Sequence, residues 1–139
     1  MNADIWNVLH DGSVHSVSGA VPDDVRLSVC IDYLRNRFPD PGNRILLTLH
    51  GCTALTFQTY EDVAALTDFD AIAKAEPEIL QAKDWTDASV VECVNGTIRV
   101  TATGFSLALD NGRAITLDEL CSVAEAYWKE LKERSKNSS

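Results

Sequence analysis

Several features that mark particular classes of protein are missing from this chain of 139 residues. Its seven glycines are scattered singly, so neither a phosphate-binding loop nor a dinucleotide fingerprint is present. The acidic spacing of an EF-hand calcium loop does not occur. Apolar runs are only a few residues long, far short of the roughly 18 residues that a membrane-spanning helix needs. No basic region followed by an apolar one opens the chain, so we expect no secretory signal and a cytoplasmic location.

Cysteine is present, but not in the arrangements that mark metal or redox sites. The four cysteines, Cys30, Cys52, Cys93 and Cys121, include no C-x-x-C pair, so neither a zinc knuckle nor a thioredoxin-type motif is indicated. His50 and Cys52 stand close together, but a tetrahedral zinc site needs a second such pair. We therefore expect reduced thiols that pack as small apolar side chains, and neither a metal nor another cofactor.

Positive charge is scarce. Twelve lysines and arginines stand against 21 aspartates and glutamates, for a formal net charge of −9. Because phosphate groups are bound by clustered Lys and Arg, this balance argues against nucleic acid or an anionic membrane as a partner. The negative charge is also concentrated, since residues 59–87 hold eight acidic residues and two basic ones. This distribution favours a surface that attracts a basic protein.

What remains is the composition of an ordinary globular domain. Hydrophobic residues make up 45% of the chain and charged residues 24%, well away from disordered proteins. We expect a single domain at residues 1–134 and a frayed tail at 135–139. The short strand patterns predict an α+β fold: a curved antiparallel sheet or partly open barrel of about seven to nine strands, with one C-terminal helix packed on it.

The strongest hairpin signal lies at residues 90–101. Two alternating apolar runs flank Asn95-Gly96, a dipeptide that suits a tight turn because both residues accept positive φ angles. A two-residue turn at this dipeptide would place Glu92 opposite Arg99 as a cross-strand ion pair, with apolar side chains on the other face.

Weaker patterns predict three more hairpins. They join residues 5–10 to 13–18 around Asp11-Gly12, residues 45–49 to 53–59 around Gly51, and residues 106–109 to 113–115. The segment 25–38 fits two structures, because its apolar residues alternate as in a strand and also recur at helical spacing. Its β-branched content favours a long strand.

The C-terminal helix has clear start and stop signals. Thr116 and Glu119 form a capping box, and basic residues gather near the end, where they suit the helix dipole. One apolar stripe follows the helix: Leu117, Leu120, Cys121, Ala124, Trp128 and Leu131. We expect this stripe to lie across one face or opening of the sheet.

The middle segment 60–87 lacks alternation and predicts an irregular flap outside the sheet. Within it, Asp68 can cap a short helix over residues 69–75. Pro77 fits the first position of another short turn that ends at Gln81.

This flap is the predicted functional surface. We expect a non-enzymatic binding protein of the inhibitor type, similar in general composition to the immunity proteins that neutralise bacterial toxins, with carboxylates that attract a basic protein and aromatic side chains that anchor it. No specific motif supports that similarity. The predicted partner-binding residues are Tyr60, Glu61, Asp62, Asp68, Phe69, Asp70, Glu76, Glu78 and Trp85.

A second hypothesis comes from another class of protein. His10, His15, His50 and Cys52 could point into one pocket of the sheet and serve a small-molecule binder or a hydrolase-like enzyme. The two hypotheses differ in where these side chains lie, because a pocket requires them to converge. The sequence leaves open whether the protein is a monomer or a homodimer.

Overall fold

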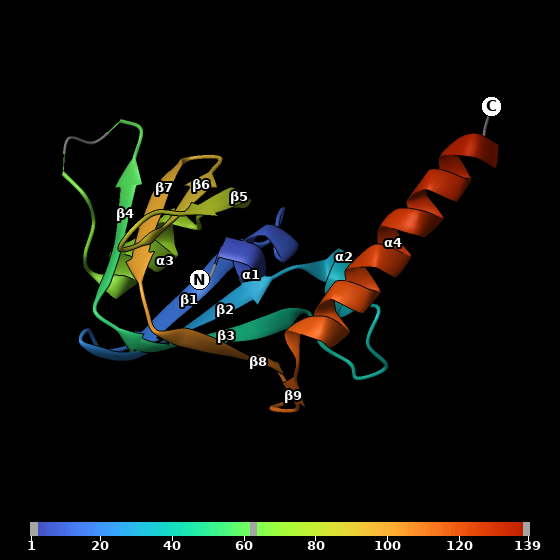
Figure 1. Ribbon diagram of the computed structural model, residues 1–139, viewed down its shortest axis with the longest axis horizontal. Coiled ribbons are helices and arrows are strands. Elements are labelled where there is room, and N and C mark those ends of the chain that lie inside the picture. Colours follow the sequence, from blue (N-terminus) through green and yellow to red (C-terminus); the bar gives the residue numbers. More distant parts are fainter. Residues whose placement is uncertain (1–2, 62–63, 138–139) are drawn as a thin grey trace.

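The computed structural model describes residues 3–61 and 64–137, and these form the predicted α+β fold (Figure 1). A five-stranded antiparallel sheet has the order β1-β2-β3-β8-β9, and a four-stranded one has the order β4-β7-β6-β5. The strands are β1 (Ser13–Gly19), β2 (Asp23–Cys30), β3 (Arg44–Cys52), β4 (Ala54–Thr59), β5 (Ile79–Asp84), β6 (Ser89–Cys93), β7 (Gly96–Thr101), β8 (Gly104–Leu109) and β9 (Ala114–Ile115). The helices are α1 (Ala3–Val8), α2 (Asp32–Arg35), α3 (Phe69–Ala75) and α4 (Leu117–Asn137).

The two sheets share a bent pair of strands. The chain passes from β3 into β4 through Thr53, and from β7 into β8 beside it, so the paired strands turn together from one sheet into the other (Figure 1). On the far side the sheets meet again, where Val14 donates to the carbonyl of Pro77 and Ile79 donates to that of Gly12. The sheets therefore wrap around one core without closing into a barrel.

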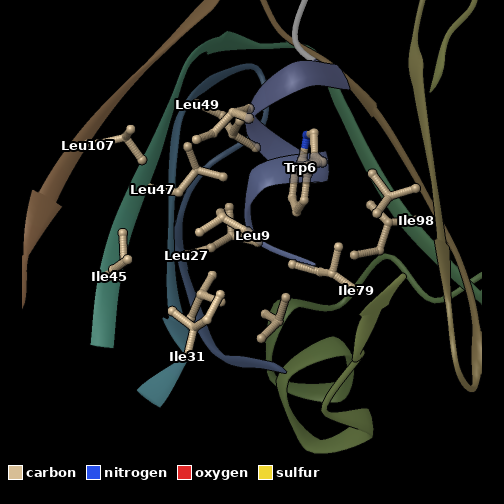
Figure 2. Close-up of a cluster of buried hydrophobic side chains, with 14 of the residues drawn as sticks. Trp6, Leu9, Leu27, Ile31, Ile45, Leu47, Leu49, Ile79, Ile98 and Leu107 are labelled. Carbon is tan, nitrogen blue, oxygen red and sulfur yellow. The ribbon is translucent and has the colours of Figure 1, made fainter. Parts of the chain in front are cut away.

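The helix α1 fills the space between the sheets. Its Ile5 and Trp6, together with Leu9, are fully buried. In Figure 2, Trp6 and Leu9 lie between Leu27 and the strand β3 on one side and residues of the four-stranded sheet on the other. The predicted strand at residues 5–10 is therefore wrong, because these apolar side chains form one stripe of a short helix instead of two strand faces.

The hairpin at residues 90–101 is confirmed, but its predicted register is wrong. Cys93 pairs with Gly96, so the turn consists of Val94 and Asn95, and neither Asn95 nor Gly96 has a positive φ angle. Gly96 is needed for packing, since a Cβ atom there would lie 2.3 Å from the carbonyl oxygen of Gln58.

The change of register also removes the predicted ion pair between Glu92 and Arg99. Glu92 stands opposite Thr97 and accepts a hydrogen bond from Gln81, with 2.6 Å between Nε2 and Oε2. The guanidinium of Arg99 lies 3.4 Å from Asp87.

Two other strand predictions need correction. Residues 45–59 do not form a hairpin, because Gly51 and Thr53 lie at the bend that carries β3 into β4. The segment 25–38 combines both predicted structures: β2 ends at Cys30, and α2 follows it. The strands at residues 106–109 and 113–115 do pair as predicted, with Leu107 opposite Ile115.

The predicted flap holds more regular structure than expected. Asp68 caps α3 as predicted, since its carboxylate accepts a hydrogen bond from the backbone of Asp70. The predicted turn from Pro77 to Gln81 is wrong, because β5 begins at Ile79 and forms one edge of the four-stranded sheet.

The capping box of α4 is confirmed, with 3.0 Å between the backbone nitrogen of Glu119 and Oγ1 of Thr116. The helix does not lie across a sheet. Its main neighbours are α1 and α2, and its C-terminal half projects away from the body of the protein (Figure 1). In the predicted tail, residues 135–137 continue α4, and residues 138–139 lie outside the described part. None of the described helices combines the length and apolar character needed to cross a membrane.

Candidate functional site

A cleft of about 650 Å³ lies between the two sheets, where β1 and β4 run along their open sides. β1 contributes Val17, Ser18 and Gly19, and β4 contributes Ala54, Leu55 and Thr56. The start of α3 forms a further wall. Val17, Leu55 and Phe69 supply an apolar floor, whereas Asp68 and Asp70 bring carboxylates, and none of the described residues that line the cleft is a lysine or arginine. This cleft is the candidate site.

The edge of β4 that borders the cleft is only partly occupied. Phe57 exchanges two backbone hydrogen bonds with Leu66, at 3.0 and 2.7 Å, so that end of the edge is paired. Backbone groups alternate between the two sides of a strand, so the N–H and C=O of Leu55 also point away from β7, toward the cleft. An edge position whose backbone groups have no partner among the described residues can accept another strand.

The opposite edge of the same sheet is blocked. The side chain of Asn7 in α1 mimics a neighbouring strand: its Nδ2 lies 3.0 Å from the carbonyl oxygen of Ala82 in β5, and its Oδ1 lies 2.7 Å from the nitrogen of the same residue. The backbone nitrogen of Ala3 also donates to the carboxylate of Asp84. Another strand could therefore pair with the edge at β4 but not with the edge at β5.

The acidic wall of the cleft has a rigid support. The carboxylate of Asp68 caps α3, with 3.1 Å between Oδ1 and the nitrogen of Asp70. Ile72, only 1% exposed, anchors the helix in the core, and α3 packs against β1. Phe69 is partly buried, and the carboxylates of Asp68 and Asp70 are exposed. The three neighbouring residues predicted from sequence thus share one wall.

The other residues of the predicted acidic surface lie elsewhere. Tyr60, Glu61 and Glu78 lie around the turn between β6 and β7, where the Tyr60 hydroxyl donates to the carbonyl of Cys93 at 2.9 Å. Glu76 is at the C-terminal end of α3, near the same turn, because Asn95 donates to the carbonyl of Ala75.

Trp85 follows the opposite end of β5 and is 50% exposed, with the Lys83 ammonium 5.7 Å from its ring. Asp62 lies outside the described residues. The structure therefore divides the described residues of the predicted surface into three separate parts, and the part formed by Asp68, Phe69 and Asp70 borders the cleft between β1 and β4.

The side chains of the second hypothesis do not share a pocket. His10 stacks on Trp128 with 5.2 Å between ring centres, and His15 is exposed on β1. Cys52 is fully buried, and burial raises the pKa of its thiol. Among the described residues, no group of three or more histidine, cysteine, aspartate or glutamate side chains is placed to hold a metal ion.

His50 has partners that the sequence did not suggest. Its Nε2 lies 2.9 Å from Oγ of Ser106, and its Nδ1 lies 3.3 Å from Oδ2 of Asp24. Hydrogen bonds from the backbone of Gly51 and from His50 lower the pKa of Asp24. The order serine, histidine, aspartate matches that of a catalytic triad, but the His50 and Asp24 side chains are 44% and 54% exposed. These hydrogen bonds join side chains of three neighbouring strands, β8, β3 and β2.

Comparison with protein-family models, with curated proteins and with solved structures finds no match. The case for the cleft therefore comes from its geometry. The sequence indicated Asp68, Phe69 and Asp70, but it missed Val17, Ser18, Leu55 and Thr56. The strands that carry these four residues were predicted. The sequence contained no sign, however, that β1 and β4 face each other across the end of the two sheets.

Proposed function

We propose that this protein binds an extended, basic segment of another protein in the cleft between β1 and β4, and that it acts by occupying that segment without catalysing a reaction. One observation carries the proposal: an open strand edge, an apolar floor and two carboxylates border the same cleft. Strand addition to an exposed edge is a recurring mode of peptide recognition, in which the backbone gives affinity and alternate side chains give specificity.

The cleft fits a segment in which basic and apolar residues alternate. Hydrogen bonds to the backbone of Leu55 would hold the segment against β4. Side chains of an added strand point alternately to its two faces, so one set can reach the apolar floor at Val17 and Phe69. The other set lies toward Asp68 and Asp70, where lysine or arginine finds opposite charge.

The charge of the whole protein supports the same class of partner. The net charge of −9, with its concentration in residues 59–87, attracts a basic protein over distances longer than those of direct contact. Exposed charges are screened by salt, with a Debye length of about 8 Å at physiological ionic strength. The affinity is therefore expected to fall as the salt concentration rises.

The test is a titration with two synthetic octapeptides, one of alternating lysine and valine and one of alternating glutamate and valine, followed by calorimetry. We expect the lysine peptide to bind and the glutamate peptide not to bind. The informative variant is D68N/D70N, because asparagine caps a helix as well as aspartate does, so the fold is retained while the charge is lost. This variant should weaken binding by roughly three- to tenfold.

The matched control is D87N. Asp87 is also an exposed carboxylate in the acidic segment, but it lies beside Arg99, away from the cleft. It should leave the affinity for the lysine peptide within about twofold of the original value. Equal binding of both peptides, or equal losses in D87N and D68N/D70N, would overturn the proposal.

A further inference from the structure

The body of the protein covers only part of the apolar stripe along α4. Leu120 is fully buried, and Tyr127 packs on Tyr33 with 4.7 Å between ring centres. Beyond this region the helix leaves the body of the protein (Figure 1). Trp128 stacks with one side on His10, but Trp128 and Leu131 remain 39% and 42% exposed, large values for side chains of this kind.

A groove of about 500 Å³ lies between α4 and α1, next to the exposed tryptophan. Val8, Cys121 and Ala124 line it together with Trp128, and its exposed surface is almost entirely apolar. The charged side chains along its length are Glu125, Lys129 and Lys132. The groove thus offers an apolar seam with acidic charge toward the start of the helix and basic charge toward its end.

The same division holds for the helix as a whole. Residues 117–126 contain three acidic residues and no basic one, whereas residues 127–137 contain four basic and two acidic ones. A second copy of α4 that runs in the opposite direction would therefore bring each acidic half against a basic half. A parallel copy would bring like charges together, so the charge pattern selects the antiparallel arrangement.

We propose that α4 pairs with α4 of a second copy of this chain, antiparallel, about a two-fold axis that passes the groove face of α4 at the level of residue 127. With the axis there, Glu125 of each copy stands opposite Lys129 of the other, because the two residues are equally far from residue 127. Trp128 of each copy then lies over the groove of the other. Such an interface is isologous, so the contacts that one copy makes are repeated by its partner, and it closes as a dimer.

This pairing would bury the stripe that the fold leaves exposed. Two antiparallel helices that pack along a straight seam follow the geometry of helix bundles. A helix of 21 residues is roughly 31 Å long, so an interface along one face of it belongs with the small and reversible ones. The pairing does not depend on the cleft between β1 and β4.

The test measures the mass of the full chain by sedimentation equilibrium over a series of concentrations at low salt. We expect a reversible monomer–dimer equilibrium. W128E should raise the dissociation constant of the dimer at least about tenfold, because a charge at the centre of the interface replaces its largest apolar side chain. W85E changes another exposed tryptophan, far from α4 in the chain, and should leave the equilibrium unchanged.

Exchange of the charges at Glu125 and Lys129 tests the antiparallel orientation of the two helices directly. Rescue of the dimer by a second exchange also shows that the single variants still fold. E125K and K129E should each weaken the dimer, because each places like charges across the interface. The double variant E125K/K129E, and an equimolar mixture of the two single variants, should both restore it. A monomer at every concentration, a dimer that survives W128E, or single variants that are not rescued would each overturn the proposal. Circular dichroism of each variant confirms that α4 is intact.

Discussion

The guanidinium of Arg35 is fully buried and lies 2.7 Å from Oδ1 of Asp110. Arg35 also donates to the backbone carbonyls of Arg44, Asp40 and Pro41, while the other carboxylate oxygen of Asp110 accepts hydrogen bonds from the backbone of Asn43 and Arg44. One buried cation thereby fixes the connection between α2 and β3 to the end of β8.

Removal of the charge on Asp110 should cost much of the stability of the protein. In D110N the buried guanidinium of Arg35 loses its compensating charge, and because Asp110 itself is partly exposed we expect a cost of about 1.5–3 kcal/mol, the usual contribution of a hydrogen bond to a charged group. The control is D87N, since the pair between Asp87 and Arg99 is exposed and such pairs contribute about 0–1 kcal/mol. Urea denaturation measures both variants. Equal effects of D110N and D87N would contradict this role for Arg35.

The carboxylate of Asp110 should also make the stability of the fold sensitive to acid. Partial burial alone raises the pKa of Asp110, but hydrogen bonds from Arg35, Asn43 and Arg44 outweigh it and hold that pKa below its usual range. A carboxyl group whose pKa is lower in the folded than in the unfolded protein stabilises the fold above its unfolded pKa, about 3.9, and this contribution is lost as the pH falls through the folded value.

We therefore expect the free energy of unfolding to fall between about pH 5 and pH 2, and to fall less steeply in D110N. Urea denaturation over this pH range gives both slopes. Identical slopes in D110N and the original protein would show that the carboxylate does not have a lowered pKa.

Local sequence signals predicted elements in this protein better than they predicted connections between them. The capping signals at Asp68 and Thr116 are local, and both helices begin where these residues indicate. Asp11-Gly12 shows the limit of such signals. Asp11 has a φ of 68°, as a hairpin turn would require, but it follows a helix. A positive φ serves a helix end as well as a tight turn, so the dipeptide alone does not distinguish the two.

The predictions that were wrong concern features that depend on contacts between distant segments of the chain. Gly96 is present because β4 passes close to it, not because the turn needs it, so the predicted register slipped by two residues. The strand β5 has an irregular burial pattern, and its edge is completed by Asn7, a side chain 75 residues earlier in the chain, so no local pattern announces it. The cleft depends on the same kind of information, since β1 and β4 belong to different sheets.

The cysteines should differ sharply in reactivity. Burial raises the pKa of Cys93 to about 12 and also raises that of Cys52, and both side chains are fully buried. Because the thiolate is the reactive form, neither should react with iodoacetamide in the folded protein near neutral pH. Cys30 and Cys121 are partly exposed, but burial and nearby carboxylates raise the pKa of the Cys121 thiol, so Cys30 should react first and Cys121 after it. Mass spectrometry of digested protein gives the order, and early modification of Cys52 would contradict it.

Ser106 should remain unreactive toward fluorophosphonates despite its hydrogen bond to His50. Ser106 is exposed, as are His50 and Asp24, whereas nucleophilic catalysis is strongest in a site that excludes water and stabilises an oxyanion. Incubation with a fluorophosphonate probe, followed by mass spectrometry, tests this directly. Labelling of Ser106 that disappears in H50Q would show instead that the three residues form an active triad.

The most direct test of the account is the protection of the Leu55 amide from hydrogen exchange when the lysine–valine peptide binds. If an extended segment adds to β4, the Leu55 N–H gains a partner and its exchange slows, with chemical-shift changes confined to the region of Val17, Leu55 and Phe69. The amide of Ala82 in β5 already has Asn7 as its partner and should not change. Binding that leaves Leu55 unprotected, or that shifts residues around Trp85 or Tyr60 instead, would contradict the assignment of the cleft.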